Sequence, residues 1–254
     1  MGKLILNTFS ASKLNEKLIL LIIFTLITVS WYYMVFMMSM NMAPISHWST
    51  LDILLLFIMW SIMMAGMMLP SALPVILLVE KINQNRKIRK AKYSHTLYFV
   101  LGYLLSWTLY SFIITLVQYG LHYLSILSPM MISAQKWFTC LLLFSAGVYQ
   151  WLPIKQRCLK LCRSPLSFII TQWQEGTLNS IKIGFKHGQY CIGCCWVLMA
   201  LLFVAGVMDL KWILALTVIV LIEKLAPYGA VFSKILGIGL ILSCVFILVR
   251  FHYS

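Results

Sequence analysis

The sequence predicts an all-α protein: a polytopic bundle of about seven transmembrane helices, or six, with the N-terminus in the cytoplasm. Of the 254 residues, 62% are hydrophobic and only 10% are charged. Several apolar runs approach or exceed the roughly 18 to 20 residues that cross a bilayer. Because no long polar insert interrupts them, residues 1–254 are expected to form one integral membrane domain without a separate soluble domain.

The net charge of +14 follows the membrane topology and does not indicate a nucleic-acid partner. Basic residues gather before the first span and in two loops at about residues 80–95 and 153–190. By the positive-inside rule these clusters face the cytoplasm, as in a multi-pass protein of the bacterial inner membrane, with the lipid bilayer as the first partner. They would also attract anionic lipid head groups.

The apolar runs predict spans at residues 18–38, 51–79, 96–118, 134–152, 191–208, 212–226 and 229–250. The first run is too long for a signal peptide and no small-residue cleavage site follows, so we expect it to be retained. The sixth run is short and is interrupted by "EKLAPYG", which leaves six helices as the alternative. Residues 164–190 mix apolar and polar side chains, as in an interfacial helix.

The second span contains an unusual run of sulfur, "MWSIMMAGMMLPSALP". Ten of the fifteen methionines lie between residues 34 and 68, whereas a lone methionine in a helix usually fills a gap. At about 100° per residue, one stripe and its flank would form a column of thioethers. Its members are Met59, Met63 and Met67, with Met64 and Met68 beside them.

Two prolines end this methionine run. Pro70 and Pro74 remove backbone donors and free the carbonyls of Gly66 and Pro70, which must find other partners in lipid. A broken helix of this kind marks a binding site, but a simple packing kink explains the prolines equally well.

A second sulfur cluster is "HGQYCIGCCWVLM". If a helix starts near Tyr190, Cys191, Cys194 and Cys195 share one face at its beginning, with His187 one turn below. Thiolates and thioethers favour Cu(I), whereas a closed zinc site would require four ligands. The alternative is that these cysteines are buried small hydrophobic residues.

A third group is "CLKLC", in which Cys158 and Cys162 are separated by one helical turn. They are either further ligands or reactive thiols, or residues of an ordinary solvated loop. All of these cysteines fall on the predicted cytoplasmic side, where thiols stay reduced. Met199 falls near the middle of the bilayer and Met208 and His47 near the outer surface, so sulfur would extend across the membrane.

Other polar residues carry less information. Glu223 and Lys224 end the sixth span, either as a buried functional pair such as a proton relay, or with Lys224 extending to the surface. No phosphate-binding GxxxxGK[ST] loop, aspartyl-phosphate motif, carboxylate pair or Ser-His arrangement stands out. We therefore expect neither an enzyme nor an ATP-driven pump.

Five segments resemble an uncharacterised bacterial family described as predicted metal-binding integral membrane proteins. The segments run from the second to the sixth span, and the chain has Gly66 where the family usually has alanine. They are "WSIMMAGMMLPSALP", "AGVYQWLPIKQRCLKLCRSP", "HGQYCIGCCWVLM", "GVMDLKW" and "EKLAP". The resemblance implies metal binding, and the ligands themselves indicate a soft metal.

These observations predict a membrane protein that binds Cu(I) and transports it or hands it to a metallochaperone or a membrane metalloenzyme. Zinc or another soft metal is the alternative cargo. Two other functions stay open: a membrane thiol redox carrier using the five cysteines, and a non-transporting assembly subunit of a membrane metalloenzyme.

Overall fold

The computed structural model describes residues 2–37, 49–91, 93–127, 135–164, 166, 169, 171 and 176–252, with side chains between residues 16 and 249. These residues are almost entirely α-helical, which confirms the all-α class. The helices are α1 (Gly2–Tyr32, continued by the π-helical turn η1, Tyr33–Met37), α2 (Thr50–Ile88), α3 (Thr96–Tyr123), α4 (Lys136–Tyr149), α5 (Pro153–Arg163), α7 (Thr177–Ala200), α8 (Leu202–Ala205), α9 (Leu210–Leu225) and α10 (Gly229–His252).

Five segments of the described chain are long and apolar enough to cross a membrane. They are Glu16–Met37, Thr50–Ile88, Thr96–Tyr123, Thr177–Ala205 and Gly229–Val249. The fourth predicted span qualifies only if α4 and α5 count as one helix bent by 63°. The sixth predicted span forms α9, which at 16 residues falls below the usual spanning length.

Two of the predicted cytoplasmic loops are largely helical. Helix α2 continues to Ile88, so it includes the first half of the 80–95 loop. In the 153–190 loop, Pro153–Arg163 forms α5, and α7 already begins at Thr177. The predicted helix start near Tyr190 is therefore wrong, because Lys182, Lys186 and His187 lower the local hydropathy without ending the helix. The span predicted at 191–208 corresponds to the longer apolar segment Thr177–Ala205.

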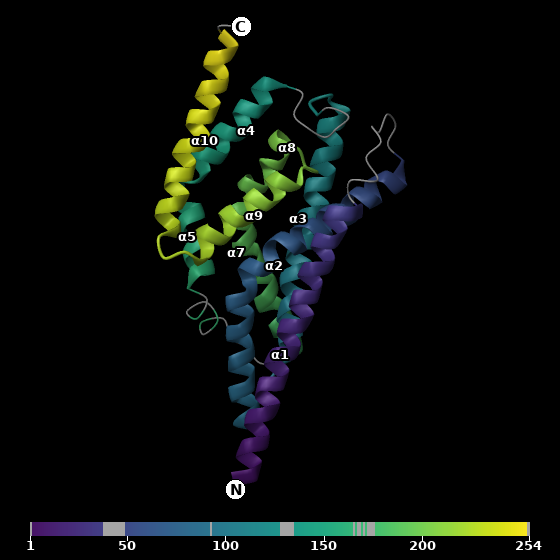
Figure 1. The fold of residues 1–254 in the computed structure, drawn as a ribbon, viewed down its shortest axis with the longest axis vertical. Coiled ribbons are helices and arrows are strands. Elements are labelled where there is room, and N and C mark those ends of the chain that lie inside the picture. The colour runs from purple at the N-terminus through teal and green to yellow at the C-terminus, as the bar shows by residue number, and fades with distance from the viewer. Residues whose placement is uncertain are drawn as a thin grey trace.

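Glycines set the closest helix contacts in the core. A Cβ on Gly102 of α3 would lie 2.0 Å from the carbonyl oxygen of Ile181, and one on Gly184 of α7 would lie 2.0 Å from that of Phe99. Such contacts between small residues let membrane helices approach closely. Helix α2 also packs against α3, and α1 packs on α2, so the core contains α2, α3 and α7 (Figure 1).

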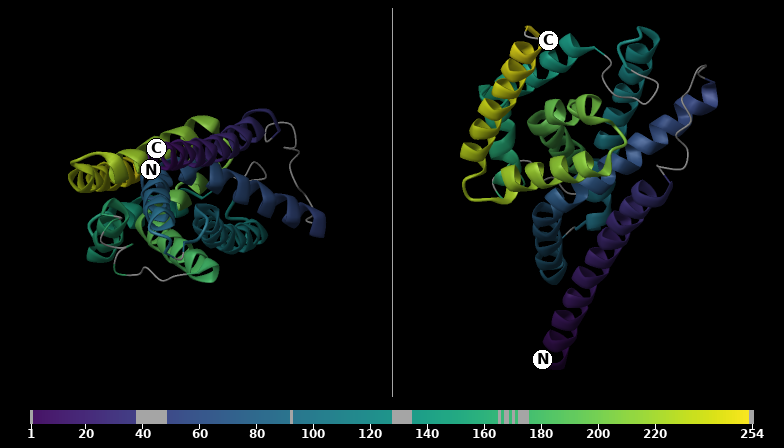
Figure 2. Two further views of the ribbon diagram at one scale, coloured as in Figure 1. Left: turned by 90° about the horizontal axis from the view of Figure 1, so that it is seen from below. Right: turned by 45° about the horizontal axis from the view of Figure 1, so that its top comes forward.

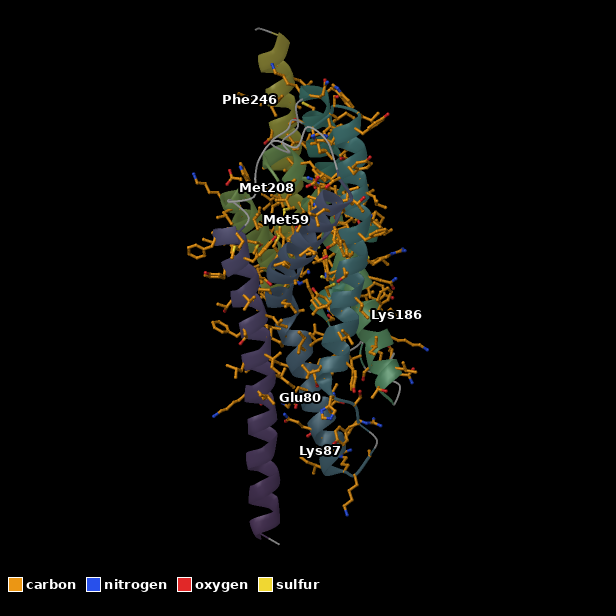
Figure 3. All side chains as sticks on the ribbon, turned by 90° about the vertical axis from the view of Figure 1, so that its right-hand side faces the viewer. Met59, Glu80, Lys87, Lys186, Met208 and Phe246 are labelled. Atoms are coloured by element: carbon orange, nitrogen blue, oxygen red, sulfur yellow. The ribbon has the colours of Figure 1, made fainter. Side chains whose placement is uncertain are left out.

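Helix α2 is continuous through its two prolines but changes direction partway along its length (Figures 1 and 2). Its first part carries the methionines. In Figure 3, Lys87 lies toward the end at which α1 begins, Lys186 lies nearer the middle of the molecule, and Met59 and Met208 lie toward the other end.

Candidate metal centre

Three thiols on α7 form the centre of the candidate site. Cys191, Cys194 and Cys195 share one face and are each at most 2% exposed. They lie in the second half of α7, far from its start at Thr177. The Sγ atoms of Cys194 and Cys195 both donate to the carbonyl oxygen of Cys191, at 3.0 Å.

Side chains from two other helices contact Cys191, and each of them also contacts α2. The Nζ of Lys224 on α9 lies 2.8 Å from the Cys191 Sγ and donates to the Ser71 hydroxyl at 3.0 Å. The Tyr103 hydroxyl of α3 lies 3.1 Å from the same sulfur and 3.2 Å from the Met68 carbonyl oxygen. Cys191 is thus joined, through one cation and one phenol, to the part of α2 where the methionine run ends.

The two cysteines of the "CLKLC" motif lie on α5, so the solvated-loop alternative is wrong. Helix α5 packs against α7, and both thiols are half-buried. The side chains of Cys162 and Cys194 lie next to each other. The Cys158 Sγ lies 2.9 Å from the position that a Cβ on Gly193 would occupy, so the glycine makes room for this thiol. The structure therefore brings α5 and α7 thiols together.

A buried ion pair holds α5 in this position. Both carboxylate oxygens of Glu223 lie 2.9 Å from the Nζ of Lys155, and these side chains are 1% and 0% exposed. Lys155 also donates to Gln150, which accepts from the Ser233 hydroxyl. Glu223 and Lys224 therefore do not pair with each other, and Lys224 does not extend to the surface, because it points to Cys191.

The methionines of α2 are buried as a continuous stripe inside the bundle. Their exposed fractions are 5% for one and 0% for the other four, namely Met59, Met63, Met64, Met67 and Met68. Met199 of α7 is fully buried as well, and Met34 of η1 packs over Gly66. Met37 is exposed and Met208 is partly buried. The predicted outer residues Met38, Met40, Met42 and His47 lie outside the described residues.

The thiols are close together without forming a finished metal cage. Within the part of the chain that the structure describes, no three His, Cys, Asp or Glu side chains converge on one point as metal ligands. The hydrogen bonds from Cys194 and Cys195 to the backbone explain this, since they direct two of the sulfurs toward a carbonyl. Rotation about the Cys side chains is needed before they can share an ion.

Comparison with known proteins identifies the family. A model of the PpoB2 copper chaperone family matches residues 57–247, which include all five segments singled out in the sequence. The chain belongs to this copper chaperone family. No curated protein and no solved structure matches it. Membership connects the chain with copper handling and with a non-enzymatic role.

The predicted ligand His187 is buried beside the thiols of α7. This side chain is 3% exposed and lies one turn before Cys191 on α7, as the spacing predicts. Its ring centroid is 5.9 Å from that of Phe99 and 6.0 Å from that of Tyr103. His187 is therefore held between aromatic rings of α3, on the N-terminal side of the thiols.

Sequence reasoning missed two buried charged residues of this copper chaperone. Lys155 was assigned to a cytoplasmic cluster, although it is fully buried. Glu80 of α2 is 5% exposed and accepts hydrogen bonds from Thr96 at 2.6 Å and Gln84 at 2.8 Å. An acidic residue on the same helix face as Ile76 and Asn83 is the signal that would have revealed the second one.

Proposed function

We propose that this copper chaperone is an integral membrane protein that binds Cu(I) at the thiols of α7 and passes it between these thiols and the methionines of α2. The observation that carries the proposal is the meeting point at Cys191. There the Tyr103 hydroxyl contacts both the buried Cys191 thiol and the backbone carbonyl of Met68, the last methionine of the stripe. The buried Lys224 ammonium lies beside the same thiol.

The donor atoms support Cu(I) as the cargo. Thiolates and thioethers are soft ligands that select Cu(I), whereas hard cations prefer oxygen ligands. Cys191, Cys194 and Cys195 lie in a buried environment with the Lys224 ammonium beside one sulfur. A nearby cation stabilises a thiolate, which is the form of cysteine that binds metal.

The order of the sites follows from the helices that carry them. Neutral thioethers have little charge to desolvate, so the stripe from Met59 to Met68 offers weak sites along α2. Tyr103 connects the end of this stripe with Cys191. We propose that the ion leaves the last methionines, displaces the thiol hydrogen bonds to the Cys191 carbonyl and binds the rotated sulfurs.

The thiols of α5 are the proposed exit to a partner. Cys162 contacts Cys194, and Cys158 lies over Gly193 on the same side of α7. Both are less buried than the α7 thiols, so a soluble metallochaperone or a membrane metalloenzyme reaches them first. On the predicted topology this exchange takes place at the cytoplasmic side of the bacterial inner membrane.

The experiment is a Cu(I) competition titration of the purified protein under reducing conditions. We expect the triple variant Cys191→Ser, Cys194→Ser, Cys195→Ser to lose at least about 100-fold in affinity, since even outer-shell changes cost about 10–100-fold. The matched control is Cys140→Ser with Cys244→Ser, which removes two buried thiols where α4 and α10 pack together; the Cys140 Sγ donates to the Cys244 carbonyl oxygen. Wild-type affinity in the triple variant would refute the proposed site.

A thiol redox carrier is the second candidate, favoured by the contact between Cys162 and Cys194. In that function the two thiols would lose two electrons and two protons to an acceptor disulfide as they form their own disulfide. The variant Cys162→Ser distinguishes the functions. If the protein is a redox carrier, this variant should lose its dithiol activity. If it is a copper chaperone, the variant should keep the tight α7 site and lose Cu(I) transfer to the partner.

A further inference from the structure

The outer side of α5 lines a pocket that copper transfer does not use. This open pocket has a volume of about 460 Å³ and lies between α5 and the start of α10. Its lining residues are Gln156, Leu159, Lys160, Arg163, Ser164 and Ala230. At about 100° per residue, they occupy a different side of α5 from the thiols.

The pocket is cationic. Lys160 is exposed and Arg163 is half-buried, and none of the described residues that line the pocket is acidic. One guanidinium nitrogen of Arg163 donates to the carbonyl oxygens of Ala226 and Pro227, at 2.7 and 2.6 Å. These bonds fix the guanidinium at the pocket through its Nη2 atom, and its positive charge suits an anion such as phosphate.

The surroundings of the pocket are those of a membrane interface. Trp151 is half-exposed, and the Nζ of Lys234 lies 5.6 Å from its ring centroid. Tryptophan and lysine are typical of the head-group level. Just beyond, Val231 and Ile235 expose apolar side chains on α10. The two cations of the pocket thus lie where a lipid-facing apolar surface ends.

We propose that this pocket binds the phosphate group of an anionic phospholipid, with its acyl chains along α10. Lys160 supplies a mobile point charge and Arg163 a charge fixed in place by its bonds to the backbone, as in basic pockets that recognise lipid head groups between helices. The bound lipid then holds α5 against α7. Because α5 carries Cys158 and Cys162, the lipid would thereby support copper transfer, and this role rests on the proposed function. Lipid binding itself is independent of copper.

The test is native mass spectrometry of the purified full chain with added phosphatidylglycerol or phosphatidylcholine. We expect the wild type to retain phosphatidylglycerol and to release phosphatidylcholine. Each basic residue near an anionic surface contributes a factor of about five, so Lys160→Gln with Arg163→Gln should weaken phosphatidylglycerol binding about 25-fold. Lys160→Gln alone changes an exposed side chain and should lose about fivefold while the fold survives.

The matched control is Lys81→Gln with Arg89→Gln, which removes the same two charges from exposed positions of the α2 end. It should weaken lipid binding far less than the pocket variant, because these exposed residues line no described pocket. Equal losses in the control, or unchanged binding in both pocket variants, would overturn the proposal. Competition by inorganic phosphate at the lipid concentration would overturn the lipid as the source of the phosphate. A failed Cu(I) titration with intact lipid binding would contradict the proposed function alone.

Discussion

The methionines of α2 and the thiols of α7 are both buried soft donors, but their surroundings differ. Met63, Met64 and Met67 lie in an apolar stripe. Cys191, in contrast, contacts the Lys224 ammonium and the Tyr103 phenol. Nearby, the ion pair of Lys155 and Glu223 joins α5 to α9. Thioethers need only packing, whereas a thiolate in lipid needs charge and hydrogen bonds. The proposed function assigns these two settings to weak transit sites and to a tight site held by polar contacts.

The largest loss of stability is expected when the ion pair between Lys155 and Glu223, which joins α5 to α9, is broken. Glu223→Gln leaves the Lys155 ammonium buried without its carboxylate, which should lower the free energy of unfolding by about 3–5 kcal/mol. Chemical denaturation in detergent micelles measures this. The double variant Lys155→Met with Glu223→Leu should recover most of the loss, because apolar replacements of buried pairs are often neutral. Wild-type stability of Glu223→Gln would mean that the pair does not hold α5.

Replacing methionines of α2 with leucine should preserve packing but slow the movement of Cu(I). Met63→Leu with Met67→Leu nearly conserves volume, so it should cost less than about 1.5 kcal/mol in unfolding free energy. In copper-loaded vesicles the same variant should slow Cu(I) flux, because the thioether sites are gone. Ile76→Leu, a similar change at a buried position of the same helix without sulfur, is the control. Flux at the wild-type rate would make these methionines packing residues, and no flux in the wild type would indicate a non-transporting assembly subunit.

The smallest effect is expected at the contact between α5 and α7. In Gly193→Ala, the added Cβ would lie 2.9 Å from the Cys158 Sγ and displace this thiol. Alanine gains about 1 kcal/mol of helix propensity, so stability should change by less than about 1 kcal/mol. Maleimide labelling of Cys158 should become faster. Gly239→Ala, whose Cβ meets nothing within 4 Å, is the control, and an unchanged labelling rate in Gly193→Ala would place Cys158 elsewhere.

Sequence patterns predicted what depends on local periodicity. The spacing of Cys191, Cys194 and Cys195 predicted one helix face, and the methionine spacing predicted a stripe, and both are buried as such. The start of α7 was missed because hydropathy treats Lys182 and Lys186 as loop residues, although a helix can carry them on its outer side. Apolar runs located the helices but not which of them reach across a membrane.

Long-range partners could not be predicted from the sequence. Glu223 and Lys224 are neighbours in the chain, but consecutive side chains of a helix point in different directions, so they meet Lys155 and Cys191. The contact of Cys162 with Cys194 depends on the bend between α4 and α5, which no local pattern specifies. These tertiary contacts are the ones that assemble the candidate site.

X-ray absorption of the copper-loaded protein under reducing conditions tests most directly whether the buried thiols hold the ion. The account predicts Cu(I) with sulfur neighbours only in the wild type. It also predicts loss of the bound copper, or of thiolate sulfur from its nearest shell, in the variant with serine at Cys191, Cys194 and Cys195. A shell dominated by nitrogen or oxygen, or the same sulfur shell in that variant, would contradict it.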